Sequence, residues 1–205
     1  MASAHSVPCQ PWFALDVVAA GLLPEDWLAQ VLAAARAPER IAVQTGVAPK
    51  PEDDIFSILP GPAVRARLGW LWELYLGPLR AFASESFGRP LYVANRVSSA
   101  MTLNILDGIG AEQAWHADSN AVTGVFYATT HAGEAGALEL RDSDGSVAQF
   151  RPRAGMFVCL RGHLQHRVVP LDSRCQRLSF ALLYYDSPTD QPFASADDRH
   201  EMSAQ

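Results

Sequence analysis

Trp115-His116-Ala117-Asp118 is the stretch around which this chain is organised. A histidine and an aspartate two residues apart project to the same side of an extended segment, so an imidazole and a carboxylate can meet at one point. His-x-Asp also occurs by chance in many proteins, where it is part of an ordinary loop. Its meaning therefore depends on whether the rest of the chain supplies a third ligand and a fold that brings the ligands together.

A third metal ligand is offered downstream by His166, which lies in the apolar, β-rich segment 164–168. Two histidines and one carboxylate on one face of an octahedron suit iron(II) and leave the opposite face open. His163 is the rival, but it follows Arg161-Gly162, a predicted turn, whereas His166 continues into a strand-like run. The preferred metal ligands, which are also the predicted catalytic residues, are His116, Asp118 and His166.

Arg177 begins a later apolar segment, and Ser179 shares its face by alternation. An arginine that points into an apolar barrel is unfavourable unless it meets an anion, and a planar guanidinium binds a carboxylate through two hydrogen bonds. A dicarboxylate that chelates iron at one end and meets Arg177 at the other, such as 2-oxoglutarate, would satisfy both groups. The alternative is a surface arginine paired with an acid.

From Leu91 onward the apolar residues recur with a period of two, which predicts a series of short strands. Asp107-Gly108, Ala132-Gly133, Asp144-Gly145 and Ala154-Gly155 are the turn signals between them. The predicted strands are Leu91–Val97, Met101–Leu106, Val122–Thr129, Ala137–Leu140, Val147–Phe150, Met156–Leu160, His166–Val169 and Leu178–Tyr185. So many short strands after a few helices predict a jelly-roll barrel.

The N-terminal part has helical periodicity with interruptions. Pro24-Glu25-Asp26 begins a predicted helix that ends before Pro38, and Pro62 to Phe87 is predicted as helix with a break at Gly77-Pro78. Pro11–Val18 and Ile41–Ala48 are predicted strands, and Lys50–Pro60, with its prolines and acids, is a predicted loop.

The predicted fold class is α+β and mainly β: a double-stranded β-helix (jelly-roll) barrel with N-terminal supporting helices. We expect one domain over residues 1–205. Residues 1–90 are the mostly helical support, 91–186 the jelly-roll core and 187–205 a tail.

Composition limits the partners of the chain. Its 205 residues are 49% hydrophobic and 19% charged, as in a soluble globular domain. A formal charge of −6 provides no basic footprint for nucleic acid. No apolar run has membrane-spanning length, and no signal peptide is recognisable at the N-terminus. Three cysteines without paired spacing favour reduced thiols and a cytoplasmic location. Nothing indicates an oligomeric state.

The segment from about Met101 to Asp186 resembles the iron(II)/2-oxoglutarate-dependent dioxygenases, and within them the prolyl-hydroxylase-like branch. The resemblance rests on four motifs that follow His-x-Asp in the order of that family: Ala121–Ala128, Ala135–Leu140, Leu164–Val168 and Arg177–Phe180. It implies that His116, Asp118 and His166 bind iron.

The resemblance also implies the contacts of the co-substrate. Arg177 and Tyr127 would bind the distal carboxylate of 2-oxoglutarate, Ser179 would assist, and Leu138 would pack against the carbon chain. The spacing from His166 to Arg177 is slightly longer than is usual in the family, and Arg174, within that turn, ranks second as the carboxylate clamp. Related hydroxylases often have a tyrosine about ten residues before the first ligand, where this chain has Leu106. Asn104 is the alternative polar contact there.

The implied activity is hydroxylation of an unactivated C–H bond with iron(II), 2-oxoglutarate and dioxygen, and with release of succinate and CO2. Desaturation or cyclisation are alternative outcomes. A small molecule or amino-acid-like compound is preferred as substrate over a protein, the substrate of a prolyl-type hydroxylase. A cupin-like metal-binding or ligand-binding protein is the alternative of another class. The expected substrate contacts are Val43–Leu59, which could form a lid, Asn95–Ser99 with Arg96, and Ser119–Asn120.

Overall fold

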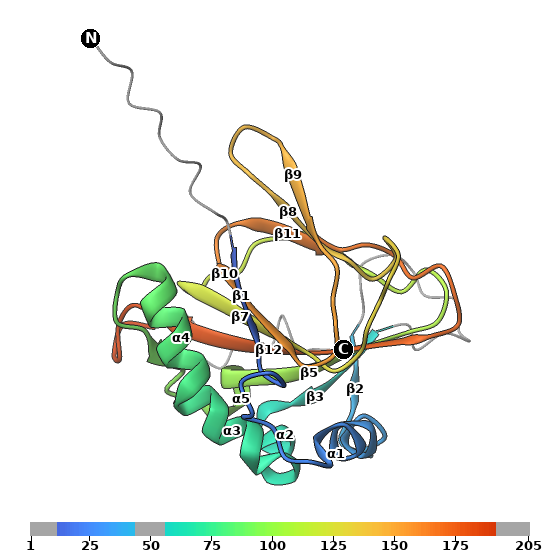
Figure 1. The fold of residues 1–205 in the computed structure, drawn as a ribbon, viewed down its shortest axis with the longest axis horizontal. Coiled ribbons are helices and arrows are strands. Elements are labelled where there is room, and N and C mark those ends of the chain that lie inside the picture. Colours follow the sequence, from blue (N-terminus) through green and yellow to red (C-terminus); the bar gives the residue numbers. More distant parts are fainter. Residues whose placement is uncertain (1–11, 44–55, 192–205) are drawn as a thin grey trace.

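The structure, a computed structural model, describes residues 12–43 and 56–191, and this part of the chain contains twelve strands and five helices (Figure 1). The strands are β1 (Trp12–Asp16), β2 (Ile41–Ala42), β3 (Phe56–Pro60), β4 (Tyr92–Val93), β5 (Met101–Asp107), β6 (Gln113–His116), β7 (Val122–Tyr127), β8 (Leu138–Arg141), β9 (Val147–Phe150), β10 (Met156–Arg161), β11 (Gln165–Val168) and β12 (Gln176–Tyr185). The helices are α1 (Trp27–Ala34), α2 (Gly61–Arg67), α3 (Gly69–Leu76), α4 (Pro78–Phe87) and α5 (Val97–Ala100).

Two antiparallel sheets face each other and form the barrel (Figure 1). The larger has the order β1-β10-β7-β12-β5-β3-β2, with β4 also paired to β12, and the smaller has the order β6-β11-β8-β9. Leu138 and Leu140 of β8 pack with Leu160 of β10, so the inner faces of the two sheets meet. This arrangement confirms the predicted mainly β jelly roll. The first 90 residues supply supporting helices and also three strands of the larger sheet.

The central strand β12 uses both of its faces. Leu178, Phe180 and Leu182 are fully buried in the main core. Because side chains alternate along a strand, Arg177 and Ser179 project from the opposite face into the barrel, where each is 1% exposed. One strand therefore anchors the sheet to its helical support and supplies polar groups to the barrel interior.

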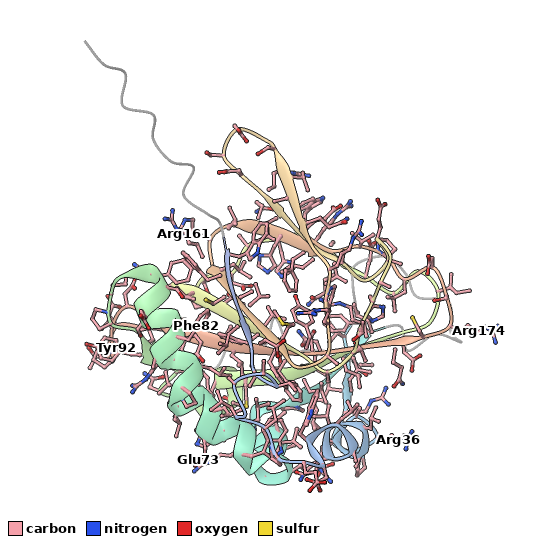
Figure 2. The ribbon with its side chains drawn as sticks, in the orientation of Figure 1. Arg36, Glu73, Phe82, Tyr92, Arg161 and Arg174 are labelled. Carbon is pink, nitrogen blue, oxygen red and sulfur yellow. The ribbon has the colours of Figure 1, made fainter. Side chains whose placement is uncertain are left out.

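Helices α1 to α4 cover the outer face of the larger sheet (Figure 1). Trp27 of α1 lies 5.6 Å from Phe126 of β7, measured between ring centroids. Phe82 of α4, which is labelled in Figure 2, lies 6.1 Å from Phe157 of β10 by the same measure. The predicted break at Gly77-Pro78 is confirmed: α3 ends at Leu76, and proline begins α4, where a missing N–H is tolerated. In the described residues no helix is both long enough and apolar enough to cross a membrane.

Tyr75 of α3 joins the helices to the sheet. Its hydroxyl donates to the carbonyl of Leu183 and accepts from the amide of Ala94, both at 2.8 Å, although the ring is fully buried. The ring also lies 5.1 Å from that of Tyr184. This one hydroxyl satisfies two backbone groups that would otherwise lack partners in the core.

The prediction of a loop over Lys50–Pro60 is wrong for its last part. Phe56–Pro60 is strand β3, hydrogen-bonded to β5 on one side and β2 on the other. The prolines misled because Pro60 lies at the very end of the strand, where it precedes α2 and breaks no ladder. Residues 50–55, and most of the predicted strand Ile41–Ala48 and of the Val43–Leu59 lid, lie outside the described residues.

The predicted strand Leu91–Val97 is also mostly wrong. Only β4 is strand, because it pairs solely with the last two residues of β12, and the chain then turns into α5. Gly61 leaves the space for that turn: a Cβ there would overlap the carbonyl oxygen of Val97.

Candidate metal centre and anion site

Three side chains converge inside the barrel: His116 at the end of β6, Asp118 just beyond it, and His166 in β11. One potential ligand atom from each lies within 4.8 Å of the others. The Nε2 atoms of His116 and His166 are 3.8 Å and 3.7 Å from the two carboxylate oxygens of Asp118. The structure therefore brings together the three residues that the sequence predicts as ligands.

Strand pairing and backbone carbonyls set the direction of both imidazoles. His116 and His166 are paired across β6 and β11, and their ring centroids are 4.2 Å apart. In each ring Nδ1 lies 2.8 Å from the carbonyl oxygen two residues earlier, Ala114 or Leu164. An Nδ1–H that donates to a carbonyl leaves Nε2 unprotonated and directed at the shared point, which is the tautomer a metal requires.

The electrostatics of His166 favour the neutral ring. Burial lowers its pKa, the neighbouring His116 lowers it further, and the Asp118 carboxylate opposes both. A neutral imidazole is the form that coordinates a metal ion.

Asp118 reaches the site by a different route from the one its spacing suggested. Strand β6 ends at His116, so strand alternation does not account for the position of Asp118. Its backbone amide instead donates to the carbonyl of Gly162 at 2.8 Å, and its carboxylate accepts from the Thr123 hydroxyl. Thr123 and Gly162 were missed by sequence reasoning, because no pattern along the chain marks the contacts of Asp118 with a β7 residue and with the turn after β10.

Arg177 is a buried cation deeper in the barrel. Nε donates to the carbonyl of Gly136 at 2.8 Å and Nη1 donates to the Ser179 hydroxyl at 2.9 Å. No carboxylate within residues 12–43 and 56–191 forms an ion pair with it. Burial lowers its pKa, which is the expected response of a positive charge placed in a low-dielectric interior without an anion.

Tyr127 stands beside this cation, with its ring centroid 5.2 Å from the Arg177 guanidinium carbon. Burial raises the pKa of Tyr127 to about 12, and the nearby Arg177 charge opposes that rise. Its hydroxyl is therefore a neutral donor. Among the described residues it is also the one buried side-chain polar atom that has no hydrogen-bond partner. A cation without an anion and a donor without an acceptor thus lie side by side, as an anion site requires.

The remaining predicted contacts are on the inner faces of the sheets. Leu138 is buried with Leu140 and Leu160. Asn104 is paired with Ser179 across β5 and β12, and its side chain accepts from the Thr102 hydroxyl at 3.1 Å. Leu106 is fully buried in a small apolar cluster with Ala111, Val168 and Leu171. Packing in this cluster explains why position 106 holds a leucine and not the tyrosine of related hydroxylases. The polar group that β5 places next to Ser179 is Asn104.

The rival residues lie elsewhere. His163 is exposed and is not part of the histidine–aspartate cluster. Arg174 is exposed, and Figure 2 shows it extending from the outer edge of the molecule, away from the barrel. Asn120, an expected substrate contact, is only 4% exposed and is hydrogen-bonded to Thr123.

Comparisons with known proteins identify the fold. No protein-family model matches the chain, and no curated protein matches it in sequence. Among solved structures, the non-heme alpha ketoglutarate dependent epimerase SnoN from nogalamycin biosynthesis is 16% identical, with a TM-score of 0.65 over 91% of this chain and 87% of that one. A second SnoN structure is a complex with Fe3+, alpha ketoglutarate and nogalamycin RO.

Two further structures are similar over most of their length. A 2OG-Fe(II) oxygenase family oxidoreductase from Burkholderia pseudomallei is 16% identical, with a TM-score of 0.65 over 86% of each chain. A prolyl hydroxylase from Trichoplax adhaerens, in complex with a hypoxia inducible factor peptide fragment, is 15% identical, with a TM-score of 0.63 over 95% of this chain and 88% of that one. At these identities the likeness establishes a shared fold: this chain has the double-stranded β-helix of those oxygenases.

Proposed function

We propose that this chain is an iron(II)- and 2-oxoglutarate-dependent oxygenase. His116, Asp118 and His166 would hold the iron, since two imidazoles and a carboxylate are the donor set that suits iron(II). Arg177 and Tyr127 would bind the distal carboxylate of 2-oxoglutarate. The single observation that carries the proposal is the pairing of Arg177 with Tyr127. Arg177 is buried and has no carboxylate partner in the described chain, and it lies beside the Tyr127 hydroxyl, which has no hydrogen-bond partner. Both residues lie in the same barrel as the candidate metal ligands.

The fit of 2-oxoglutarate rests on the chemistry of these groups. A carboxylate would neutralise the guanidinium and accept the hydrogen bond that Tyr127 has free. Ser179 holds Arg177 in place through the bond to Nη1, and Leu138 belongs to the apolar wall that would contact the carbon chain. Asn104, paired with Ser179, is the polar group for an additional contact. A cupin-like protein that binds only a metal would have no use for the buried cation, whereas one that binds another carboxylate would give no succinate.

Iron(II) held by these residues would, with dioxygen, supply an oxidant for an unactivated C–H bond, and 2-oxoglutarate would be converted to succinate and CO2. The chain's own residues orient the co-substrate and exclude water. Leu138, Leu140 and Leu160, each buried, form the apolar side of the interior that performs this exclusion.

A small uncharged molecule is the substrate we propose. Thr123 and Tyr127 of β7 point into the barrel, so Val125, which lies between them, points into the barrel as well. Ala181 of β12 is paired with Val125, and Thr102 of β5 is paired with Ala181, so these two residues lie on the same inner face. These three residues are partly exposed and none is charged. A protein substrate of the prolyl-hydroxylase kind is the alternative: among structures with this fold, SnoN is in complex with nogalamycin RO and the Trichoplax enzyme with a peptide fragment.

Succinate release is the test of the proposal. Purified protein should form succinate only when iron(II), 2-oxoglutarate and dioxygen are all present, and a panel of small molecules and peptides should reveal which compounds accelerate it. His116→Ala and Asp118→Ala should abolish succinate formation. Full turnover in either variant would show that the site is assigned wrongly.

A further inference from the structure

We propose that Thr123 is a positioning residue that keeps Asp118 a ligand through one oxygen only. The inference rests on the proposed function, because it concerns how the candidate iron site is oriented. Thr123 is 3% exposed and lies on the inner face of β7, and its hydroxyl donates to Oδ2 of Asp118.

Asn120 fixes the direction of that hydrogen bond. Its side-chain Nδ2 donates to Thr123 Oγ1 at 3.1 Å, and Asn120 is 4% exposed. A hydroxyl has a single proton, so it cannot serve both Asp118 and the more distant Asn120 Oδ1 at 3.4 Å. The Asn120 amide therefore donates to the Thr123 hydroxyl, and the Thr123 hydroxyl donates its own proton to the Asp118 carboxylate. Both groups are shielded from water, which strengthens the pair and restricts its rotation.

The backbone around Asp118 is fixed by a second set of contacts. The Asp118 amide donates to Gly162, and the Gly162 amide donates to Ala121 at 3.1 Å. A side chain at Gly162 would overlap the carbonyl oxygen of Asn120, so the two turns lie in direct contact. The turn thus fixes the position of the Asp118 backbone, and Thr123 fixes the rotation of the carboxylate group about its side-chain bonds.

The rotation matters for the coordination number. Both carboxylate oxygens face the imidazoles: Oδ1 lies 3.8 Å from His116 Nε2, and Oδ2 lies 3.7 Å from His166 Nε2. Thr123 engages Oδ2, so Oδ1 is the oxygen that we assign to the metal. Three ligand atoms from the protein would leave three positions of an octahedral iron(II) open, enough for a chelating 2-oxoglutarate and dioxygen. A carboxylate that bound through both oxygens would occupy one of these positions.

Cobalt(II) titration of metal-free protein, followed by its absorption spectrum, tests the proposal, because the spectrum reports coordination geometry as well as affinity. Thr123→Val, similar in size but without a hydroxyl, should bind cobalt(II) roughly 10- to 100-fold more weakly, as is usual when an outer-shell partner is lost. Its spectrum should also change. Thr123→Ser should restore both. Thr130→Val is the matched control: it makes the same chemical change at an exposed threonine just beyond β7, whose hydroxyl accepts from the Ala154 amide and does not touch Asp118, and it should bind cobalt(II) like the wild type.

The outcomes separate this inference from the proposed function. Wild-type protein that binds no cobalt(II) would overturn both. Wild-type binding with an unchanged affinity and spectrum in Thr123→Val would overturn the role of Thr123 alone. If Thr123→Val does not fold, Thr123→Ala, which introduces no bulk, replaces it and should show the same loss; wild-type binding in that variant would equally refute the inference.

Discussion

Arg177→Met separates the stability of this protein from its proposed binding of 2-oxoglutarate. Methionine preserves much of the length of the side chain and removes the charge. In the ligand-free protein the change breaks the bonds to Gly136 and Ser179, and a buried group left unpaired costs about 1–3 kcal/mol. It also removes a buried cation that has no carboxylate partner in the described chain, and the desolvation of such a cation lowers the unfolding free energy by several kcal/mol. We therefore expect an unfolding free energy equal to or above that of the wild type.

Binding of 2-oxoglutarate should respond in the opposite way. Two charge-assisted hydrogen bonds contribute about 1.5–3 kcal/mol each, so their loss should weaken binding roughly 10²- to 10⁴-fold. Wild-type protein with a divalent metal and 2-oxoglutarate at about 100 times its Kd should gain about 2.7 kcal/mol. In a chain of this size that corresponds to a rise of roughly 5–11 °C in Tm.

Thermal unfolding with and without 2-oxoglutarate measures both effects. Arg177→Met should keep or raise the ligand-free Tm and lose the ligand-induced rise. Arg174→Met is the matched control, because Arg174 is exposed and points away from the barrel, and it should retain the full rise (Figure 2). A wild-type rise in Arg177→Met would refute the clamp, and a ligand-free loss of several kcal/mol would refute the reasoning about an uncompensated charge.

Three further predictions concern the scaffold. Gly162→Ala should lower the unfolding free energy by about 1–3 kcal/mol and weaken metal binding, since the added methyl group meets the Asn120 carbonyl; calorimetry with and without metal measures both. Tyr75→Phe should reduce the unfolding free energy by about 1–3 kcal/mol in urea titrations, because two buried backbone groups lose their partner. Burial lowers the pKa of His131 in the folded state, so the unfolded chain binds its proton first and stability is lost as the pH falls below about 6.5; His131→Gln should flatten that part of the urea-midpoint profile.

The elements that sequence reasoning placed correctly are those specified by local patterns. Alternation identified β5, β7, β10 and β12 because the direction of a side chain in a strand depends only on neighbouring backbone angles. Local patterns failed at β3, where the prolines indicated a loop, and at β4, where the predicted strand was too long. The extent of a strand depends on its partners: β3 persists to Pro60 because it lies between two strands, whereas β4 is short because only two residues of β12 pair with it.

The sequence by itself determined the order of the chemical groups: His116, Asp118, Tyr127, His166 and Arg177, all within the part of the chain whose apolar period predicts a barrel. Only the tertiary structure decided how they meet. Strand pairing placed the two imidazoles side by side, and burial left Arg177 without a carboxylate in the described chain. The orientation of Asp118 was likewise set by contacts with β7 and the turn after β10, because hydrogen bonds depend on distances that sheet packing alone establishes.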